Sequence, residues 1–156
     1  MKILFVCTGN TCRSPMAEAI FNKIIKDEGL KQFESASRGI TVYETEPVNP
    51  KAQLALSGVG IYDFEHTSQK ISRVDFNDAD IVLTMTQMQK DMLVSLFKED
   101  RYKISTLMEY AYDSRMDIED PYGKSQIVYN LCAKNLYEII GKLVGHLKED
   151  FGDEDA

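Results

Sequence analysis

The strongest constraint on the fold lies at the start of the chain, where an apolar run leads through a polar loop into a helical pattern. Residues 2–6 (KILFV) predict a strand buried on both faces. In Pro15–Asp27 apolar side chains recur at helical spacing, which predicts a helix. Ser14 suits the N-cap and Pro15 the first turn of this helix, and Gly29 is a signal for its end. A strand, a loop and a helix in this order favour a parallel sheet covered by helices.

Strand patterns and helix patterns alternate along the rest of the chain. The expected strands are Ser35–Val42, Asp80–Met85 and Lys103–Leu107, and the expected helices are Ala52–Leu56, Met88–Phe97 and Ser125–Glu149. The apolar residues expected to face the core include Met88, Met92, Leu96 and Leu131, because they recur at helical spacing. Asp120–Gly123 predicts a turn before the last helix.

Composition narrows the class of protein. We expect a single domain over residues 1–150 and a solvated acidic tail over 151–156. A net charge of −7 disfavours nucleic-acid binding. No segment suits a secretory signal or a membrane span, so we expect a cytoplasmic protein with no membrane partner. Cys7, Cys12 and Cys132 match no paired zinc motif, and we expect free thiols.

The loop VCTGNTCRS, residues 6–14, has the features of an anion site. It follows a strand and precedes a helix, whose N-terminus offers unpaired N–H groups and a positive dipole end. Gly9 lets the backbone turn, and Arg13 can bind two oxygens at once. The same positive field favours the thiolate of Cys7, which indicates covalent phosphoryl transfer. The Walker and dinucleotide-binding glycine patterns are missing, so the loop gives no support for ATP or NAD binding. The structural alternative to a nucleophile is that Cys7 is a small buried residue in an ordinary turn.

CTGNTCRSP resembles the phosphate-binding loop of the low-molecular-weight protein tyrosine phosphatases, which carry Cys, five residues, Arg and Ser near the N-terminus. The likeness continues in the family's order through NPKAQLALSGVGI, EHTSQKISRVDF, DADIVLTM and DPYG, and so covers nearly the whole chain. It implies an α/β three-layer sandwich with a four-stranded parallel sheet flanked by helices. It also implies a phosphocysteine intermediate without metal or cofactor, phosphorylated protein substrates, release of inorganic phosphate, and a monomer.

The resemblance implies roles for individual residues. Cys7 is the expected nucleophile, Arg13 the phosphate ligand and Asp120 the general acid. The residues expected to bind substrate are Thr8, Gly9, Asn10, Thr11, Cys12, Ser14, Tyr43 and Tyr122, and those expected to support the site are His66 and Pro121. Ser14 would hydrogen-bond the Cys7 thiolate, cap the helix, or do both. Cys12 could trap oxidised Cys7 as a reversible disulfide, and Cys132 is expected to be a core residue.

The role of Asp120 depends on the resemblance. Taken alone, Asp-Pro-Tyr-Gly fits a type I turn, and a structural role would be the default. The family's general acid is the Asp of an Asp-Pro pair at this place in the chain, which matches Asp120 and Pro121. Asp117 and Glu119 are rivals by proximity but match no motif position.

Position 11 bears on the substrate. Many tyrosine phosphatases of this family carry a bulky aliphatic residue there, whereas their protein arginine phosphatase relatives carry threonine, as this chain does at Thr11. A smaller polar side chain leaves room for a guanidinium group and can hydrogen-bond it. We therefore expect phosphoarginine slightly ahead of phosphotyrosine, and hydrolysis of aryl phosphates in either case.

Two alternatives belong to other classes. Thioredoxin-coupled arsenate reductases share the fold and the Cys-five-Arg loop, but they need further redox cysteines near the third strand, and Leu83–Lys90 has none. A noncatalytic phosphate-binding or redox-sensing module is the second alternative. Such a module would have no evident need for Cys7, Arg13 and Asp120 together.

Overall fold

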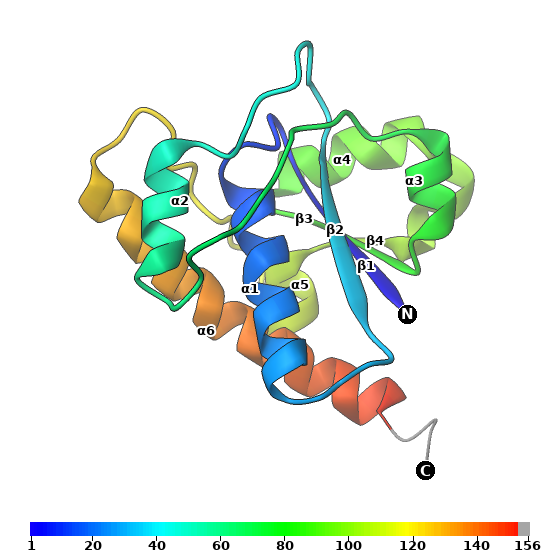
Figure 1. The fold of residues 1–156 in the computed structure, drawn as a ribbon. Coiled ribbons are helices and arrows are strands. Elements are labelled where there is room, and N and C mark those ends of the chain that lie inside the picture. The colour runs from blue at the N-terminus through cyan, green and yellow to red at the C-terminus, as the bar shows by residue number, and fades with distance from the viewer. Residues whose placement is uncertain (153–156) are drawn as a thin grey trace.

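A four-stranded sheet forms the centre of the protein in the computed structural model, which describes residues 1–152 (Figure 1). Its strands are β1 (Lys2–Cys7), β2 (Glu34–Gly39), β3 (Ile81–Thr84) and β4 (Ile104–Thr106). They lie in the order β2-β1-β3-β4, and each neighbouring pair is parallel. The apolar run at the start of the chain is therefore an interior strand, as predicted.

Helices cover both faces of the sheet. They are α1 (Arg13–Asp27), α2 (Pro50–Ser57), α3 (Arg73–Asp78), α4 (Gln87–Leu96), the 3-10 helix η1 (Lys98–Lys103), α5 (Leu107–Tyr112) and α6 (Gln126–Phe151). In Figure 1 α1, α2, α5 and the long α6 lie on one side of the strands, and α3 and α4 on the other. This arrangement confirms the predicted three-layer α/β sandwich.

Alternation along β1 places the functional cysteine. Ile3, Phe5 and Cys7 face the core shared with α1 and α6, whereas Leu4 and Val6 face the smaller core beneath α3 and α4. Cys7 is the last residue of β1, so its side chain lies at the carboxyl edge of the sheet, on the side where α1 begins.

Several predicted boundaries were wrong. β2 ends at Gly39 instead of Val42, and β4 gives way to α5 at Leu107. The short helices α3, η1 and α5 were not predicted, because they are too short for apolar periodicity to be visible. Capping boxes hold α3 and α5: the hydroxyls of Ser72 and Thr106 each accept from a backbone N–H three residues on.

Four residues predicted to lie in the core are exposed. α4 buries only Gln89 and Leu93, which continue in one row to buried Phe97 just after the helix. The next row therefore faces solvent: Met88, Met92 and Leu96 are 74%, 42% and 58% exposed, and on α6 Leu131 is 54% exposed.

The structure describes only the first part of the expected acidic tail. α6 extends to Phe151 and is followed by Gly152, so most of the acidic tail expected at 151–156 lies outside the described residues.

None of the helices within residues 1–152 is long and apolar enough to cross a membrane.

Candidate active site

The sulfur of Cys7 lies at the base of the loop between β1 and α1. Its Sγ is 2.9 Å from the Ser14 hydroxyl and accepts a hydrogen bond of 3.2 Å from the backbone N–H of Asn10. In the part of the chain that the structure describes, the N–H groups of Gly9, Thr11 and Cys12 find no protein acceptor. Cys7 is therefore surrounded by hydrogen-bond donors, several of which remain available to an anion.

The amide of Asn10 donates to Ser14, whose hydroxyl lies near both Cys7 and the Arg38 carbonyl. Asn10 Nδ2 donates to Ser14 Oγ (2.8 Å) and to Ser37 Oγ (3.0 Å), so both of its hydrogens are used. Ser14 therefore accepts from Asn10, and its own hydrogen can go to Cys7 Sγ at 2.9 Å or to the Arg38 carbonyl, which lies farther away at 3.4 Å. Ser37 passes its hydrogen on to Glu18 Oε1 at 2.7 Å. The hydroxyl of Ser14 is thus close enough to Cys7 to donate to an ionised sulfur.

Ser14 does not cap the helix, contrary to one of the two roles considered for it. α1 begins at Arg13, the cap position is Cys12, and no side chain caps it. Ser14 is the second residue of the helix and is fully buried, which brings its hydroxyl beneath the loop and toward Cys7.

The strained residue of the loop is Asn10 and not Gly9. Asn10 has φ +58°, in the left-handed region, whereas Gly9 has no positive φ. The side chain of Asn10 accepts from Gln69 N–H at 3.0 Å, and its backbone oxygen lies 2.8 Å from His66 Nε2. His66 thus contacts the loop from outside, and its supporting role stays a prediction.

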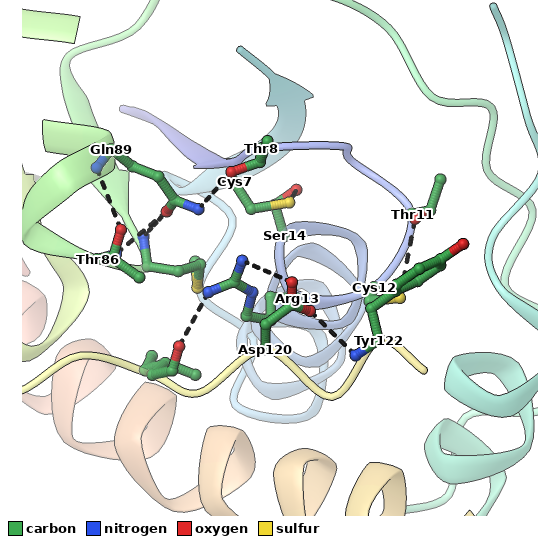
Figure 2. Close-up of polar contacts among 12 residues, drawn as sticks. Cys7, Thr8, Thr11, Cys12, Arg13, Ser14, Thr86, Gln89, Asp120 and Tyr122 are labelled. Atoms are coloured by element: carbon green, nitrogen blue, oxygen red, sulfur yellow. Dashed lines mark hydrogen bonds and ion pairs between the residues drawn. The ribbon is translucent and has the colours of Figure 1, made fainter. Parts of the chain in front are cut away.

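Arg13 faces the segment that carries the predicted acid. Its guanidinium is almost completely buried, donates from Nη1 to the Ile118 carbonyl at 3.0 Å and lies 3.5 Å from an Asp120 oxygen (Figure 2). The other Asp120 oxygen accepts from Tyr122 N–H at 3.1 Å. The structure thus brings together the two residues that the sequence places 107 positions apart.

The turn that follows Asp120 is shifted from its predicted position. Lys124 N–H donates to the Pro121 carbonyl at 2.9 Å, so the hydrogen-bonded turn spans Pro121 to Lys124. Gly123, at its third position, has φ +79°, which is the requirement of a type II turn. Asp120 stands outside this turn, and its side chain is half exposed.

A small cavity lies over the loop. It has a volume of about 220 Å³, and its walls are formed by residues 7–13, Asp120 and Tyr122. Tyr43 does not line it. That side chain, 93% exposed, borders a neighbouring hollow of about 300 Å³ that it shares with Gly9 and Thr11.

Gln89 contacts the loop and was missed in the sequence. Its Oε1 accepts from Met85 N–H (2.9 Å) and Thr86 N–H (3.1 Å), which orients Nε2 to donate to Thr8 Oγ1 at 3.1 Å. The signal was present, because Thr86 and Gln89 have the spacing of a capping box. Gln89 therefore joins the start of α4 to the first residue of the loop.

The other two cysteines differ from Cys7 in their surroundings. Cys12 Sγ lies 3.5 Å from the hydroxyl of Tyr129, and burial raises the pKa of the Cys12 thiol. Burial also raises the pKa of half-buried Cys132 to about 11. Both side chains are therefore thiols near neutral pH. All three cysteines are free.

Together these groups have the geometry of a phosphoryl-transfer site. A sulfur nucleophile lies beneath backbone N–H groups and a guanidinium, and a carboxyl group stands on the opposite side of the cavity. Together with the parallel α/β fold, this site geometry defines a small cysteine-dependent phosphatase whose phosphate site is formed by one loop. Within residues 1–152 no group of three or more His, Cys, Asp or Glu side chains could hold a metal ion.

The comparisons with known proteins identify the family. A family profile described as low molecular weight phosphotyrosine protein phosphatase matches residues 2–152. The chain belongs to this family.

Individual relatives fall into two named groups. The chain is 39% identical to a protein-arginine-phosphatase of Bacillus subtilis, over 96% of this chain and 99% of that protein. It is 36% identical to the low molecular weight protein-tyrosine-phosphatase PtpB of Staphylococcus epidermidis, over 92% and 96%. A solved structure of the YwlE arginine phosphatase, a mutant with a phosphorylated active-site serine, superposes with a TM-score of 0.90 at 37% identity, covering 97% of this chain and 99% of that one.

Family and fold together establish the activity as that of a hydrolase, a cysteine-dependent protein phosphatase. The arsenate reductase alternative is not favoured. The noncatalytic alternative is not favoured either, because the matched relatives are named as phosphatases.

Proposed function

We propose that the protein removes phosphate from phosphoarginine in proteins, with phosphotyrosine as a second substrate. The observation that carries the proposal is the small cavity over Cys7, which Thr11 of the loop lines and in which Asp120 faces Arg13. The similarity to protein-arginine-phosphatases of two bacilli supports it. Net charge −7 supports a protein substrate over nucleic acid, and we propose a cytoplasmic monomer.

In the first step Cys7 Sγ attacks phosphorus. The guanidinium of Arg13 and the loop N–H groups bind the nonbridging oxygens and stabilise the charge that grows on them. As the bond from phosphorus to the leaving nitrogen or oxygen breaks, Asp120 delivers its proton to that atom. The products are a phosphocysteine and the free side chain of the substrate.

In the second step water attacks the phosphocysteine. The Asp120 carboxylate, now ionised, takes a proton from the water as the new oxygen–phosphorus bond forms. The sulfur–phosphorus bond breaks, and the electron pair returns to Cys7. Ser14 O–H and Asn10 N–H stabilise the departing thiolate, and inorganic phosphate leaves.

Thr11 is the proposed determinant of substrate choice. It is partly buried, it lines the phosphate cavity, and its Oγ1 lies 3.8 Å from Cys12 Sγ, a weak contact that leaves the hydroxyl available. A guanidinium leaving group offers N–H donors that a phenol lacks, so a hydroxyl acceptor in the wall discriminates between the two.

Replacing Thr11 tests the substrate assignment. Thr11→Ile should lower the ratio of kcat/KM on phosphoarginine peptides to that on phosphotyrosine peptides by at least about tenfold, the order expected when one polar contact is lost. Thr41→Ile is the matched control, because Thr41 lines the neighbouring hollow and not the phosphate cavity. An equal ratio in wild type and Thr11→Ile would contradict the assignment.

A further inference from the structure

A second, larger cavity lies behind the segment that carries Asp120. Its volume is about 560 Å³, and it is enclosed by α5, α6 and the connection between them. This size falls within the range of pockets that bind organic groups or peptide side chains. We call it the acidic groove, because Asp117, Glu119 and Glu138 line it.

The acidic groove borders the phosphate cavity directly. Ile118 lines the groove, and its carbonyl oxygen accepts from Arg13 of the phosphate site. Glu119 and Pro121 also line the groove, whereas Asp120 between them lines the phosphate cavity. One stretch of backbone thus forms a wall of both, so the groove and the phosphate cavity are neighbours.

Exposed apolar side chains line the groove. Tyr112, Met116 and Leu131 are 44%, 69% and 54% exposed. Large apolar side chains gathered on a surface mark an interaction site more often than scattered ones do. The groove can therefore bury an apolar side chain of a partner.

The charge of the groove is of one sign. Asp117, Glu119 and Glu138 line it, and no lysine or arginine does within the described residues. None of the three carboxylates belongs to an ion pair in residues 1–152. Asp117 accepts only a backbone N–H, that of Gln87, at 2.9 Å. A partner that brings lysine or arginine would supply the missing charge.

We propose that the acidic groove binds the part of the protein substrate next to the phosphorylated residue, and that it selects a segment with basic and apolar side chains. The proposal rests on the phosphatase function given above. It makes the groove a specificity site for the polypeptide, separate from the phosphate cavity that recognises the phosphorylated side chain.

Phosphotyrosine peptides that differ only in their flanks test the proposal. One set carries Leu-Lys-Lys on either side of the phosphotyrosine, and the other carries Leu-Glu-Glu. Wild-type protein should show kcat/KM about fivefold or more higher on the basic set, in line with solvent-exposed charge pairs, and the preference should shrink at high salt. p-Nitrophenyl phosphate, which has no flank, serves as the reference substrate.

Matched variants separate the groove from the net charge of the protein. Glu138→Lys should abolish the preference, whereas Glu149→Lys, the same change at an exposed position of α6 outside the groove, should keep it. Leu131→Ser should lower kcat/KM on the basic peptides, whereas Ile127→Ser, at a position 70% exposed and outside the groove, should not. All four should hydrolyse p-nitrophenyl phosphate as wild type does.

Two results would overturn the proposal. Equal kcat/KM on both peptide sets would do so, and so would equal effects of Glu138→Lys and Glu149→Lys. If p-nitrophenyl phosphate is hydrolysed in those experiments, the phosphatase function stands and only the groove assignment fails. A wild-type protein inactive on every substrate would overturn both.

Discussion

At the scale of single residues, Asn10, Ser14 and Cys7 form a chain of hydrogen bonds beneath the phosphate cavity. Both hydrogens of the Asn10 amide are donated, one to Ser14 and one to Ser37, and the Ser14 hydroxyl lies closer to the sulfur, at 2.9 Å, than to its other acceptor, the Arg38 carbonyl, at 3.4 Å. A hydrogen bond to a charged group contributes about 1.5–3 kcal/mol, more than one between neutral groups. We therefore expect Ser14 to act on catalysis through the sulfur of Cys7.

Replacing Ser14 tests this reading of the bond. Ser14→Ala should lower kcat on p-nitrophenyl phosphate by about ten- to a hundredfold, because the thiolate loses its hydroxyl donor. Alkylation of Cys7 by iodoacetate near neutral pH should slow as well. Ser35→Ala is the control, since that hydroxyl bonds to Asn22 and the Glu18 carbonyl instead. Wild-type kcat in Ser14→Ala would contradict the role.

Replacing Gln89 tests whether its hydrogen bonds stabilise the fold around the loop. Gln89→Met would leave Met85 N–H and Thr86 N–H without their acceptor, and should lower the free energy of unfolding by about 1–3 kcal/mol in urea titrations. Gln126→Met is the matched control, because its amide binds Lys51 and Asn130 at the surface, and should change stability by no more than about 0.5 kcal/mol. Equal losses in both variants would count against the assignment.

At the scale of elements, the end of β2 and the residues that follow it support the loop. Ile40 N–H donates to the Cys7 carbonyl and Thr41 N–H to the Thr8 carbonyl, each at 3.0 Å. Gly39 lies so close that a Cβ there would come 2.8 Å from the Thr8 oxygen and 2.6 Å from Val42 Cγ2. The loop therefore depends on a glycine from another element.

Gly39→Ala should displace the loop. The added methyl group forces backbone to move, which should lower stability by about 1–3 kcal/mol and kcat by at least about tenfold. Gly141→Ala is the control, because nothing lies within 4 Å of a Cβ at that exposed position of α6. That variant should gain about 0.5–1 kcal/mol and keep full activity. Activity and unfolding midpoints measured on both variants decide the matter, and an active, stable Gly39→Ala would refute the close contact.

Elements were predictable where their own residues carry the pattern. The interior strand and α1 follow from apolar runs and helical spacing, and both were predicted. α4 shows the limit: its spacing marks Met88 and Leu93 alike as apolar, but only the packing of the helix on the sheet decides that Leu93 is buried and Met88 exposed. α3 and α5 are held by capping boxes, which a search for Ser or Thr three residues before an acid would have found.

At the scale of the whole molecule, the site is assembled from distant parts of the chain. The loop sequence pointed to Cys7 and Arg13 directly, but the resemblance to a family was needed to choose Asp120 over Asp117 and Glu119. The capping-box spacing could have marked Gln89 as part of the start of α4. The contacts of Gln89 and Gly39 with the loop could not be assigned from local sequence, because they exist only once α4 and β2 pack against the loop.

Glu18, on the far side of the hydrogen-bond chain from Cys7, makes global stability depend on pH. Burial raises the pKa of its carboxyl above the usual value, although the hydrogen bond from Ser37 opposes this. The folded chain therefore holds this proton more strongly than the unfolded chain. The stability that results is present below the unfolded pKa and decreases as the pH rises through the folded one.

Glu18→Gln should remove that dependence. The free energy of unfolding of wild type should decrease relative to Glu18→Gln as pH rises from about 4 to 7, in urea titrations at fixed salt. Glu34→Gln, at an exposed position of β2, controls for the loss of one carboxylate. A difference between wild type and Glu18→Gln that stays constant over this range would show that the carboxyl does not titrate abnormally.

Transfer of phosphate to Cys7 is the step on which the whole mechanism depends, and trapping it is the most direct test. Asp120→Ala protein, mixed with p-nitrophenyl phosphate and quenched in acid within milliseconds, should carry one phosphate on the peptide that contains Cys7, as seen by mass spectrometry. Cys7→Ala protein treated in the same way should carry none and release no p-nitrophenol. Phosphate found on another residue, or turnover that persists without the Cys7 sulfur, would contradict the account.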